Sequence, residues 1–217
     1  MNATIDHVFV CCAEDAPQAE ALVRLGFDEG PPNRHPGQGT ACRRFVFTNA
    51  YLELIWVEDP DEARSEAVRP TRLWDRWSRR GAGVCPFGII LRPAAGSAGE
   101  APAPFPAWRY APSYMPAGLT IDVAEGTSLS EPEIFYLGIQ RGAALARAAE
   151  AGAAPKMLTT VNVAGPLGSL SAAARALQAA GLVSFREAEG FSMELGLDAG
   201  DRGRADLRPE LPLLLRW

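Results

Sequence analysis

The chain has 217 residues, of which 21 are Lys or Arg and 26 are Asp or Glu, giving a formal net charge of −5 at pH 7. Nucleic-acid binding needs a basic face, so this mild acidity argues against nucleic acid as the main partner. No run approaches the ~20 apolar residues of a membrane span, and the first residues lack the pattern of a signal peptide. Together these features predict a cytoplasmic protein that binds no membrane.

The first predicted strand, residues 4–11, carries His7 in its middle. A histidine in an apolar strand is more often a core residue than a ligand, so His7 becomes informative only beside a suitable partner. Asp15 is expected to cap a helix over residues 16–25. That helix should end at Gly26, because glycine readily adopts the conformation that follows a helix.

A loop with three prolines and three glycines, residues 30–39, leads into two predicted strands, residues 43–48 and 50–57. Glu53 lies among apolar residues in the second strand, where an ionised carboxylate is costly unless it is paired, hydrogen-bonded or bound to a cation. The alternative is a glutamate on a solvated face of an antiparallel sheet. A strand histidine and a strand glutamate brought side by side form a metal-ligand or acid–base pair.

The remainder of the chain repeats this opening pattern near its end. A helix capped by Ser169 ends at Gly181, and Met193-Glu194-Leu195 parallels Leu52-Glu53-Leu54. The first copy is longer because it contains the loop with His35, and an insertion in one copy only is where a site is expected. The predicted segments are an N-terminal βαβββ module (1–60), a connector with a short helix (61–84), middle strands that are a degenerate module or an insertion (85–157), and a C-terminal βαβββ module (158–217).

The four cysteines, Cys11, Cys12, Cys42 and Cys85, form no Cys-x-x-Cys pair. Cys11 and Cys12 are adjacent, so their side chains point to opposite faces of an extended strand. Their spacing matches no metal motif. We therefore expect four reduced thiols that bind no metal.

Four motifs within residues 4–60 belong together: Ile5-Asp6-His7-Val8, Leu25-Gly26-Phe27, His35-Pro36-Gly37-Gln38-Gly39-Thr40 and Tyr51-Leu52-Glu53-Leu54. They resemble the vicinal-oxygen-chelate superfamily, which groups glyoxalase I, bleomycin-resistance proteins and extradiol dioxygenases, and more narrowly its glyoxalase-like branch. The resemblance implies an α+β fold of repeated βαβββ modules, whose curled mixed sheets form a cleft. It also implies metal ligands on the first and fourth strands of a module, which are His7 and Glu53 here.

The chain departs from the family's pattern at three positions. In the C-terminal copy the ligand position of the first strand falls on Thr160, and in the middle strands it falls near Gly88. The glyoxalase-like branch often carries Asn where this chain has Cys42. A full set of two His and two Glu is therefore absent at the expected positions.

The first functional hypothesis is a metal-assisted lyase or isomerase that acts on a small oxygenated organic substrate. One divalent metal ion, of a kind that the sequence does not identify, would be held by His7 and Glu53, with Glu194 as a third ligand. A dioxygenase is less favoured, because iron(II) oxygenase chemistry needs two histidines and a carboxylate.

The second hypothesis is a metal-free small-molecule-binding protein of the bleomycin-resistance type. Glu53 would then pair with Arg43 or Arg44 beside an aromatic wall. The wall would consist of Trp56, Trp74 and Trp108.

The third hypothesis is a metal-free enzyme in which His35 or Glu53 is the base. The loop that carries His35 should lie at the mouth of the cleft, with the Gly39 amide and Thr40 binding an oxygen of the substrate. All three hypotheses place the site in one cleft and name a small-molecule substrate or ligand as the partner. The sequence leaves open whether the chain forms a homodimer.

Overall fold

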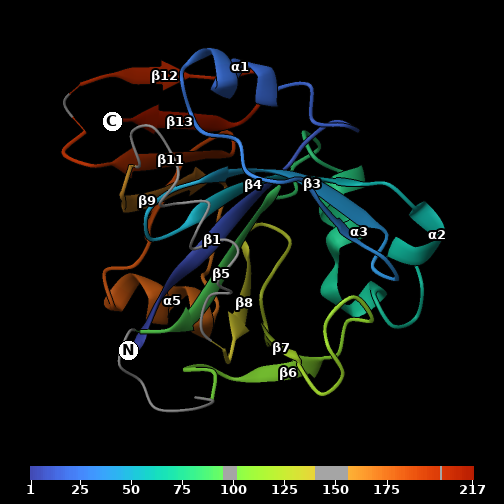
Figure 1. The fold of residues 1–217 in the computed structure, drawn as a ribbon. Helices are drawn as coiled ribbons and strands as arrows, with labels where there is room; N and C mark the ends of the chain where they lie inside the picture. The colour runs from blue at the N-terminus through green and yellow to red at the C-terminus, as the bar shows by residue number, and fades with distance from the viewer. Residues whose placement is uncertain (95–101, 140–155, 201) are drawn as a thin grey trace.

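The computed structural model describes residues 1–94, 102–139, 156–200 and 202–217 (Figure 1). These residues form thirteen strands in two mixed sheets with a few short helices, so the α+β fold predicted from the sequence is confirmed. Residues 95–101 and 140–155, which belong to the predicted segment 85–157, lie outside the described part. None of the described helices is both long and apolar enough to cross a membrane.

The first sheet has eight strands in the order β2-β3-β4-β1-β5-β8-β7-β6. β1 pairs with β4 in parallel, β5 pairs with β8 in parallel, and β1 and β5 are antiparallel neighbours at the centre. Each half of the sheet therefore has the same strand order, and the middle strands pair with the N-terminal strands. The strands are β1 (Ala3–Cys11), β2 (Asn33–His35), β3 (Thr40–Val46), β4 (Tyr51–Val57), β5 (Phe87–Pro93), β6 (Ala107–Tyr110), β7 (Ile121–Ala124) and β8 (Glu133–Leu137).

The C-terminal strands form a separate five-stranded sheet in the order β10-β9-β11-β13-β12. The helix α1 (Ala19–Arg24) lies against this sheet (Figure 1), and Gln18 Nε2 donates to the Glu210 carbonyl at 3.4 Å. The strands are β9 (Leu158–Gly165), β10 (Ser184–Glu187), β11 (Ser192–Leu197), β12 (Arg204–Asp206) and β13 (Leu213–Arg216). The other helices are α2 (Pro60–Ala63), the 3₁₀ turn Arg69–Thr71, α3 (Leu73–Ser78) and α5 (Ala172–Ala179).

Two helix starts differ from the sequence-based expectation. Asp15 does not cap α1, because its φ of 59° places it in a turn before the helix, and the capping position falls on Gln18 without a side-chain bond. The cap of α5 is Ser171, whose hydroxyl accepts from the Ala174 amide at 3.2 Å, and not Ser169. In both cases the backbone conformation just before the helix decides where the helix begins. The spacing of residues in the sequence does not reveal that conformation.

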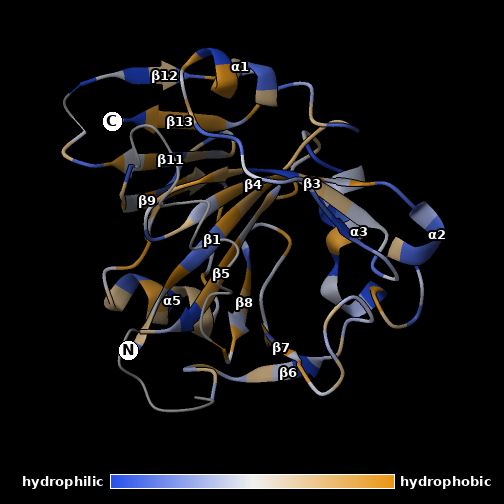
Figure 2. Cartoon of the chain, in the orientation of Figure 1, coloured by the Kyte–Doolittle hydropathy of each residue, from blue (hydrophilic) through white to orange (hydrophobic). Residues whose placement is uncertain are grey.

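The eight-stranded sheet buries both of its faces. One face joins the five-stranded sheet in a single apolar cluster that includes Leu52, Leu54 and Leu195, whereas the other face carries a second cluster that includes Phe9 and Phe135. Strands of both sheets are accordingly apolar along much of their length (Figure 2). All seven residues of β4 are buried, so the alternative of a solvated face for Glu53 is wrong.

A buried ion network fastens the connector to the middle strands. Arg76 of α3 is 0% exposed and Glu133 of β8 is 1% exposed, and their side chains meet at 3.0 Å. Arg72 reaches the same carboxylate at 2.6 Å, and Thr127 donates to it at 2.7 Å. Arg76 also donates to the Cys85 carbonyl at 3.0 Å. The negative charge of Glu133 is thus fully compensated, so this carboxylate has a structural role in the fold.

We expect Glu133→Gln to lower the free energy of unfolding by roughly 3–5 kcal/mol, because it leaves the guanidinium of Arg76 buried without a counter-charge. Urea unfolding followed by tryptophan fluorescence measures the change. Asp61→Asn is the matched control, since it removes a carboxylate whose ion pair with Arg64 is exposed, and it should leave stability nearly unchanged. Equal stability of both variants would contradict the structural role of Glu133.

Candidate functional site

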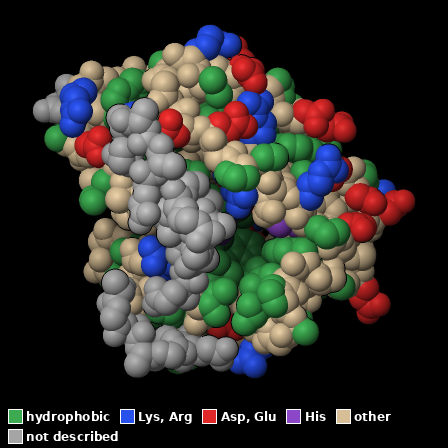
Figure 3. Space-filling view, viewed as in Figure 1, with side chains coloured by type: hydrophobic (Ala, Val, Ile, Leu, Met, Phe, Trp, Pro, Cys, Tyr) green, Lys and Arg blue, Asp and Glu red, His purple; other side chains and the backbone are tan. Residues whose placement is uncertain are grey.

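A cavity of about 230 Å³ lies on the second face of the eight-stranded sheet. In the space-filling view a hollow lined by hydrophobic side chains opens in the middle of the molecule, with a histidine at its margin (Figure 3). Both halves of the sheet contribute, together with α3 and the segment after β6. Its lining residues are His7, Phe9, Asn33, His35, Gln38, Tyr51, Glu53, Ile55, Leu73, Ile90, Tyr110, Tyr114, Met115, Ile121, Phe135 and Leu137.

His7 is held by a carboxylate from the preceding residue. The pairing of β1 with β5 shifts between Ile5 and His7, and Asp6 Oδ2 lies 2.8 Å from His7 Nδ1. Arg92 Nε lies 3.0 Å from the other oxygen of Asp6. Because a carboxylate accepts hydrogen bonds, Asp6 selects the tautomer with the proton on Nδ1 and a lone pair on Nε2. Strand alternation alone would place Asp6 on the opposite face, which is why the sequence did not reveal this role.

The lone pair of His7 faces Glu53. β1 and β4 are parallel neighbours, and His7 Nε2 lies 3.8 Å from Glu53 Oε2. The His7 ring stacks on Tyr51 at a centroid distance of 4.2 Å and an interplanar angle of 15°. The structure therefore brings together the two residues that the family resemblance implies as metal ligands.

Glu53 is a buried carboxylate, 5% exposed, and its one ion-pair contact in the described part of the chain is the contact with His7. Its other oxygen, Oε1, accepts a weak bond from Cys42 Sγ at 3.4 Å. Within the described part of the chain it forms no ion pair with Lys or Arg, and the pairing expected with Arg43 or Arg44 is absent. Arg43 binds Glu29 at 2.6 Å and is turned away from the cavity, while Arg44 Nε donates to a backbone carbonyl.

His35 belongs to a network of neutral polar groups. Its Nδ1 lies 2.9 Å from Thr40 Oγ1, and its Nε2 lies 2.9 Å from the Asn33 side-chain amide. Gln38 donates to the same Thr40 hydroxyl at 2.8 Å, and the His35 ring packs against Tyr114. Burial lowers the pKa of His35 below its ordinary value of 6.5, and the nearby Glu53 opposes this only in part. At neutral pH His35 is therefore an uncharged, fixed imidazole at the cavity wall.

Cys42 lies beside Glu53 at the site, and the expectation that no cysteine is a metal ligand stays a prediction. The ligand atoms of His35, Cys42 and Glu53 all lie within 4.8 Å of one another, so this buried group could hold a metal ion. Burial, and after it the charge of Glu53, raises the pKa of the Cys42 thiol far above its usual range. The sequence offered one signal, since Cys42 lies two residues beyond Thr40 and hence on the same strand face. All four cysteines are free and buried.

Of the other residues predicted for the site, none lines the cavity, although Thr40 supports it through His35. The Gly39 amide donates to the His35 carbonyl at 3.1 Å, which tightens the turn before β3. Trp56 lies in the core between the sheets, whereas Trp108 packs at the edge of the second cluster. Glu194 lies on β11 of the other sheet and accepts from Asn162 at 3.2 Å, so it does not join His7 and Glu53.

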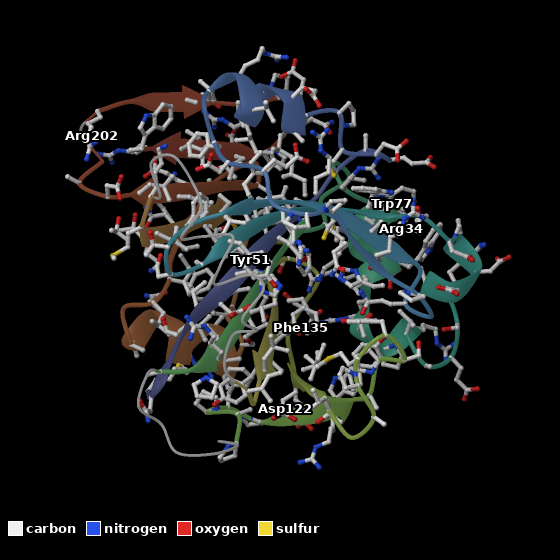
Figure 4. The ribbon with its side chains drawn as sticks, in the orientation of Figure 1. Arg34, Tyr51, Trp77, Asp122, Phe135 and Arg202 are labelled. Atoms are coloured by element: carbon white, nitrogen blue, oxygen red, sulfur yellow. The ribbon has the colours of Figure 1, made fainter. Side chains whose placement is uncertain are left out.

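The opposite half of the cavity is apolar where a second ligand pair would be expected. A side chain at Gly88 would place its Cβ 2.0 Å from Phe9 Cε1, so the Phe9 ring occupies that space. Phe135 of β8 lies 6.2 Å from Phe9, ring to ring. Tyr51 and Phe135, both labelled in Figure 4, belong to the two different halves of the sheet. Among the described lining residues, the histidine and carboxylate side chains are thus confined to the N-terminal half.

The glyoxalase-like domain family matches residues 5–104, which include both His7 and Glu53. Over these residues the chain is similar to glyoxalase-like domains. The resemblance to the vicinal-oxygen-chelate superfamily that the sequence motifs predicted is confirmed by this match. The matched residues span β1 to β5, and hence the polar half of the cavity and the central strand of the other half.

Solved structures similar to the chain include the following two. A hypothetical protein from Staphylococcus aureus is similar over 99% of this chain and 98% of its own, with a TM-score of 0.59 and 9% identity. A mutant of 4-hydroxymandelate synthase from Streptomyces coelicolor is similar over 90% of this chain and 71% of its own, with a TM-score of 0.41 and 14% identity. At such identities the first likeness shows the fold alone. No curated protein sequence matches the chain.

In protein freed of metal, we expect the stability to fall on going from about pH 7 to about pH 5, and more steeply than in the variant His35→Gln. The folded pKa of His35 is lowered, so in this range the unfolded chain binds a proton that the folded chain does not. This contribution to stability is present above the unfolded pKa of 6.5 and is lost as the pH falls toward the folded pKa. Melting temperatures across the range measure the two slopes, and identical slopes would contradict the assignment.

Proposed function

We propose that this glyoxalase-like protein is a metal-assisted lyase or isomerase acting on a small oxygenated organic substrate. The observation that carries the proposal is the series Asp6–His7–Glu53, in which one carboxylate fixes the imidazole and a second, unpaired with any described Lys or Arg, faces its lone pair. Histidines that bind metals commonly donate their other ring N–H to a carboxylate. His7 matches this pattern, because its Nδ1 faces the Asp6 carboxylate and its Nε2 is left for a metal beside Glu53.

The donor set fits one divalent cation. His7 Nε2 and the carboxylate of Glu53 would hold it, since imidazole nitrogen and carboxylate oxygen suit zinc, iron, manganese or nickel. The ring nitrogens of His35 are both engaged in hydrogen bonds, and Cys42 would have to release its proton. When bound, such an ion supplies Lewis acidity toward a carbonyl or enolate oxygen of the substrate.

Glu53 is suited to move a proton at the substrate. Its two oxygens face different neighbours, Oε2 toward His7 and Oε1 toward Cys42, so one oxygen can stay on the ligand side while the other takes or returns a proton. The neutral network of Asn33, His35 and Thr40 holds the adjoining wall in one arrangement, which limits reorganisation during reaction. The apolar lining would limit the access of water to the reacting atoms.

A second candidate, a metal-free small-molecule binder, is favoured by one specific observation. The position where a second ligand pair would be expected is filled by the Phe9 ring over Gly88, so the donor set is half of what a symmetric site would offer. In that case Glu53 and His7 would hydrogen-bond the ligand directly. The two candidates differ in whether the purified protein binds a metal.

Protein purified without chelator should contain about one divalent metal per chain by elemental analysis. After removal and reloading with Co²⁺, the affinity should be lowered by about 10–100-fold in Asp6→Asn, because the His7 ring loses its orienting carboxylate. His7→Ala should abolish binding. Absence of saturable metal binding to the wild type would reject the metal-assisted enzyme and favour the binder.

Asp122→Asn is the matched control for these titrations. It makes the same chemical change on β7, where the Asp122 carboxylate lies 3.8 Å from the exposed Arg109 (Figure 4 labels Asp122). This variant should bind Co²⁺ as the wild type does. Equal losses in Asp6→Asn and Asp122→Asn would mean that the effect is a general one and does not arise from His7.

A further inference from the structure

We infer that Asn33 is a substrate-binding residue, which turns an amide N–H into the cavity and donates a hydrogen bond to a carbonyl oxygen of the substrate. This inference rests on the proposed function, because it takes the cavity as the substrate site. It adds a residue and a requirement of the substrate that neither the family match nor the proposed chemistry specifies. Three features carry it: the free end of the Asn33 amide, the protons of its neighbours and the neutrality of the wall.

One end of the Asn33 side chain is bonded and the other end is free. Asn33 is half-buried, lines the cavity from β2, and has its Nδ2 at 2.9 Å from His35 Nε2. Within the described part of the chain, the other end of the amide has no hydrogen-bond partner. The two ends of an amide have the same shape, and a half-turn of the side chain exchanges the donor end and the acceptor end. The neighbours of Asn33 therefore decide which end is offered to the cavity.

The Thr40 hydroxyl disfavours one of the two orientations. A neutral imidazole has one N–H and one lone pair. If Asn33 donated to His35 Nε2, the ring proton would be on Nδ1 and would point at Thr40 Oγ1, which lies 2.9 Å away. Thr40 Oγ1 already accepts from Gln38 at 2.8 Å. The hydroxyl proton of Thr40, a residue that is 3% exposed, would then have no acceptor among the described residues, and a buried unpaired donor is costly.

The other orientation gives each of these hydroxyl protons an acceptor. After the half-turn of Asn33, the Thr40 hydroxyl donates to His35 Nδ1, and His35 Nε2–H donates to the Asn33 oxygen, across the same two 2.9 Å contacts. Turning Gln38 instead would give Thr40 an acceptor, but the Tyr110 hydroxyl, which donates to Gln38 Oε1 at 3.4 Å, would lose its own. Asn33 therefore presents its NH₂ group to the cavity.

This donor acts without a net charge. Burial lowers the pKa of His35, and Arg44, which lies across from Glu53 in the register of β3 on β4, favours the same neutral form, whereas Glu53 opposes it. The Asn33 amide itself does not titrate, so it donates in the same way whether or not a cation lies on Glu53. A carbonyl oxygen is an acceptor that suits such an N–H. The rest of the substrate can pack on the apolar wall opposite, which includes Ile90 and Phe135.

The tautomer of His35 tests the orientation of Asn33 directly. In isotope-labelled, metal-free protein at about pH 8, where imidazoles are neutral, NMR couplings between the ring nitrogens and the carbon-bound ring protons identify the protonated nitrogen. We expect the proton on Nε2 in His35 and on Nδ1 in His7, which faces Asp6. The chain has two histidines, so a spectrum of His35→Gln assigns both signals. A His35 proton on Nδ1 overturns the inference.

Cyclohexanone and methylenecyclohexane are matched probes of the donor, because they have nearly the same shape and only the ketone accepts a strong hydrogen bond. The cavity of about 230 Å³ has room for either ring, since one of about 150 Å³ accepts benzene in other proteins. Ligand-observed NMR titration of metal-free protein measures both affinities. In Asn33→Leu, which keeps the approximate shape, the preference for the ketone should fall by about three- to tenfold, as for one lost hydrogen bond. An unchanged preference, or no saturable binding of cyclohexanone to the wild type, overturns the inference.

Two control variants locate the donor. Asn162→Leu makes the same change on β9 of the other sheet, where Asn162 donates to Glu194 at 3.2 Å, and it should retain the wild-type preference. Tyr114→Phe removes the hydroxyl of another residue that lines the cavity, and it should retain the preference as well. A loss in Tyr114→Phe with none in Asn33→Leu, or equal losses in Asn33→Leu and Asn162→Leu, overturns the inference.

These outcomes are separable from a failure of the proposed function. The spectra and the titrations use metal-free protein, so they report on the cavity wall alone. A protein that binds no metal but shows the expected His35 tautomer and ketone preference would lose the metal-assisted mechanism and keep the role of Asn33. A protein that binds Co²⁺ at His7 but has a ketone preference independent of Asn33 would keep the mechanism and lose this inference.

Discussion

The burial of one carboxylate constrains the whole site. Glu53 is 5% exposed in the middle of β4, a strand that has no exposed residue. A buried charge must be compensated or it destabilises the fold. The neighbours that compensate it are weak ones, an imidazole at 3.8 Å and a thiol at 3.4 Å. This deficit makes the N-terminal half of the sheet a receptive place for a cation or a hydrogen-bonding ligand.

The same sheet contains a second buried carboxylate, Glu133, whose role is structural. Glu133 on β8 is as deeply buried as Glu53, but it is surrounded by Arg72, Arg76 and the Thr127 hydroxyl. These contacts hold α3 against the sheet, and both carboxylate oxygens of Glu133 already have partners. The comparison distinguishes the two carboxylates: Glu133 is completely paired and stabilises the fold, whereas the incomplete pairing of Glu53 makes it a candidate for a functional site.

The two halves of the sheet have the same strand order and opposite chemistry. The N-terminal half supplies nitrogen, oxygen and sulfur donors, whereas the middle strands supply an apolar wall, in which Gly88 of β5 is covered by the Phe9 ring from β1. Since the halves meet at the antiparallel pair β1 and β5, the boundary between polar and apolar surface runs along the centre of the cavity. A ligand that spans this boundary would be oriented by the two walls.

The sequence by itself predicted the strands of the N-terminal half and the pair of His7 and Glu53. Period-two alternation and the mid-strand positions of His7 and Glu53 predicted two strands with their functional side chains facing one cleft, because strand geometry is local. The repeat of the opening pattern likewise predicted a fold built from related modules.

Tertiary structure alone decided which groups accompany that pair. Asp6 reaches His7 only through a shift in the pairing of β1 with β5, Cys42 reaches Glu53 through the register of β3 on β4, and Glu194 is removed to a second sheet. Such contacts depend on pairing between strands distant in sequence, and a change of one residue in register moves a side chain to the other face. The donor set is therefore a property of the assembled sheet, whereas the strands that carry it are a property of the sequence.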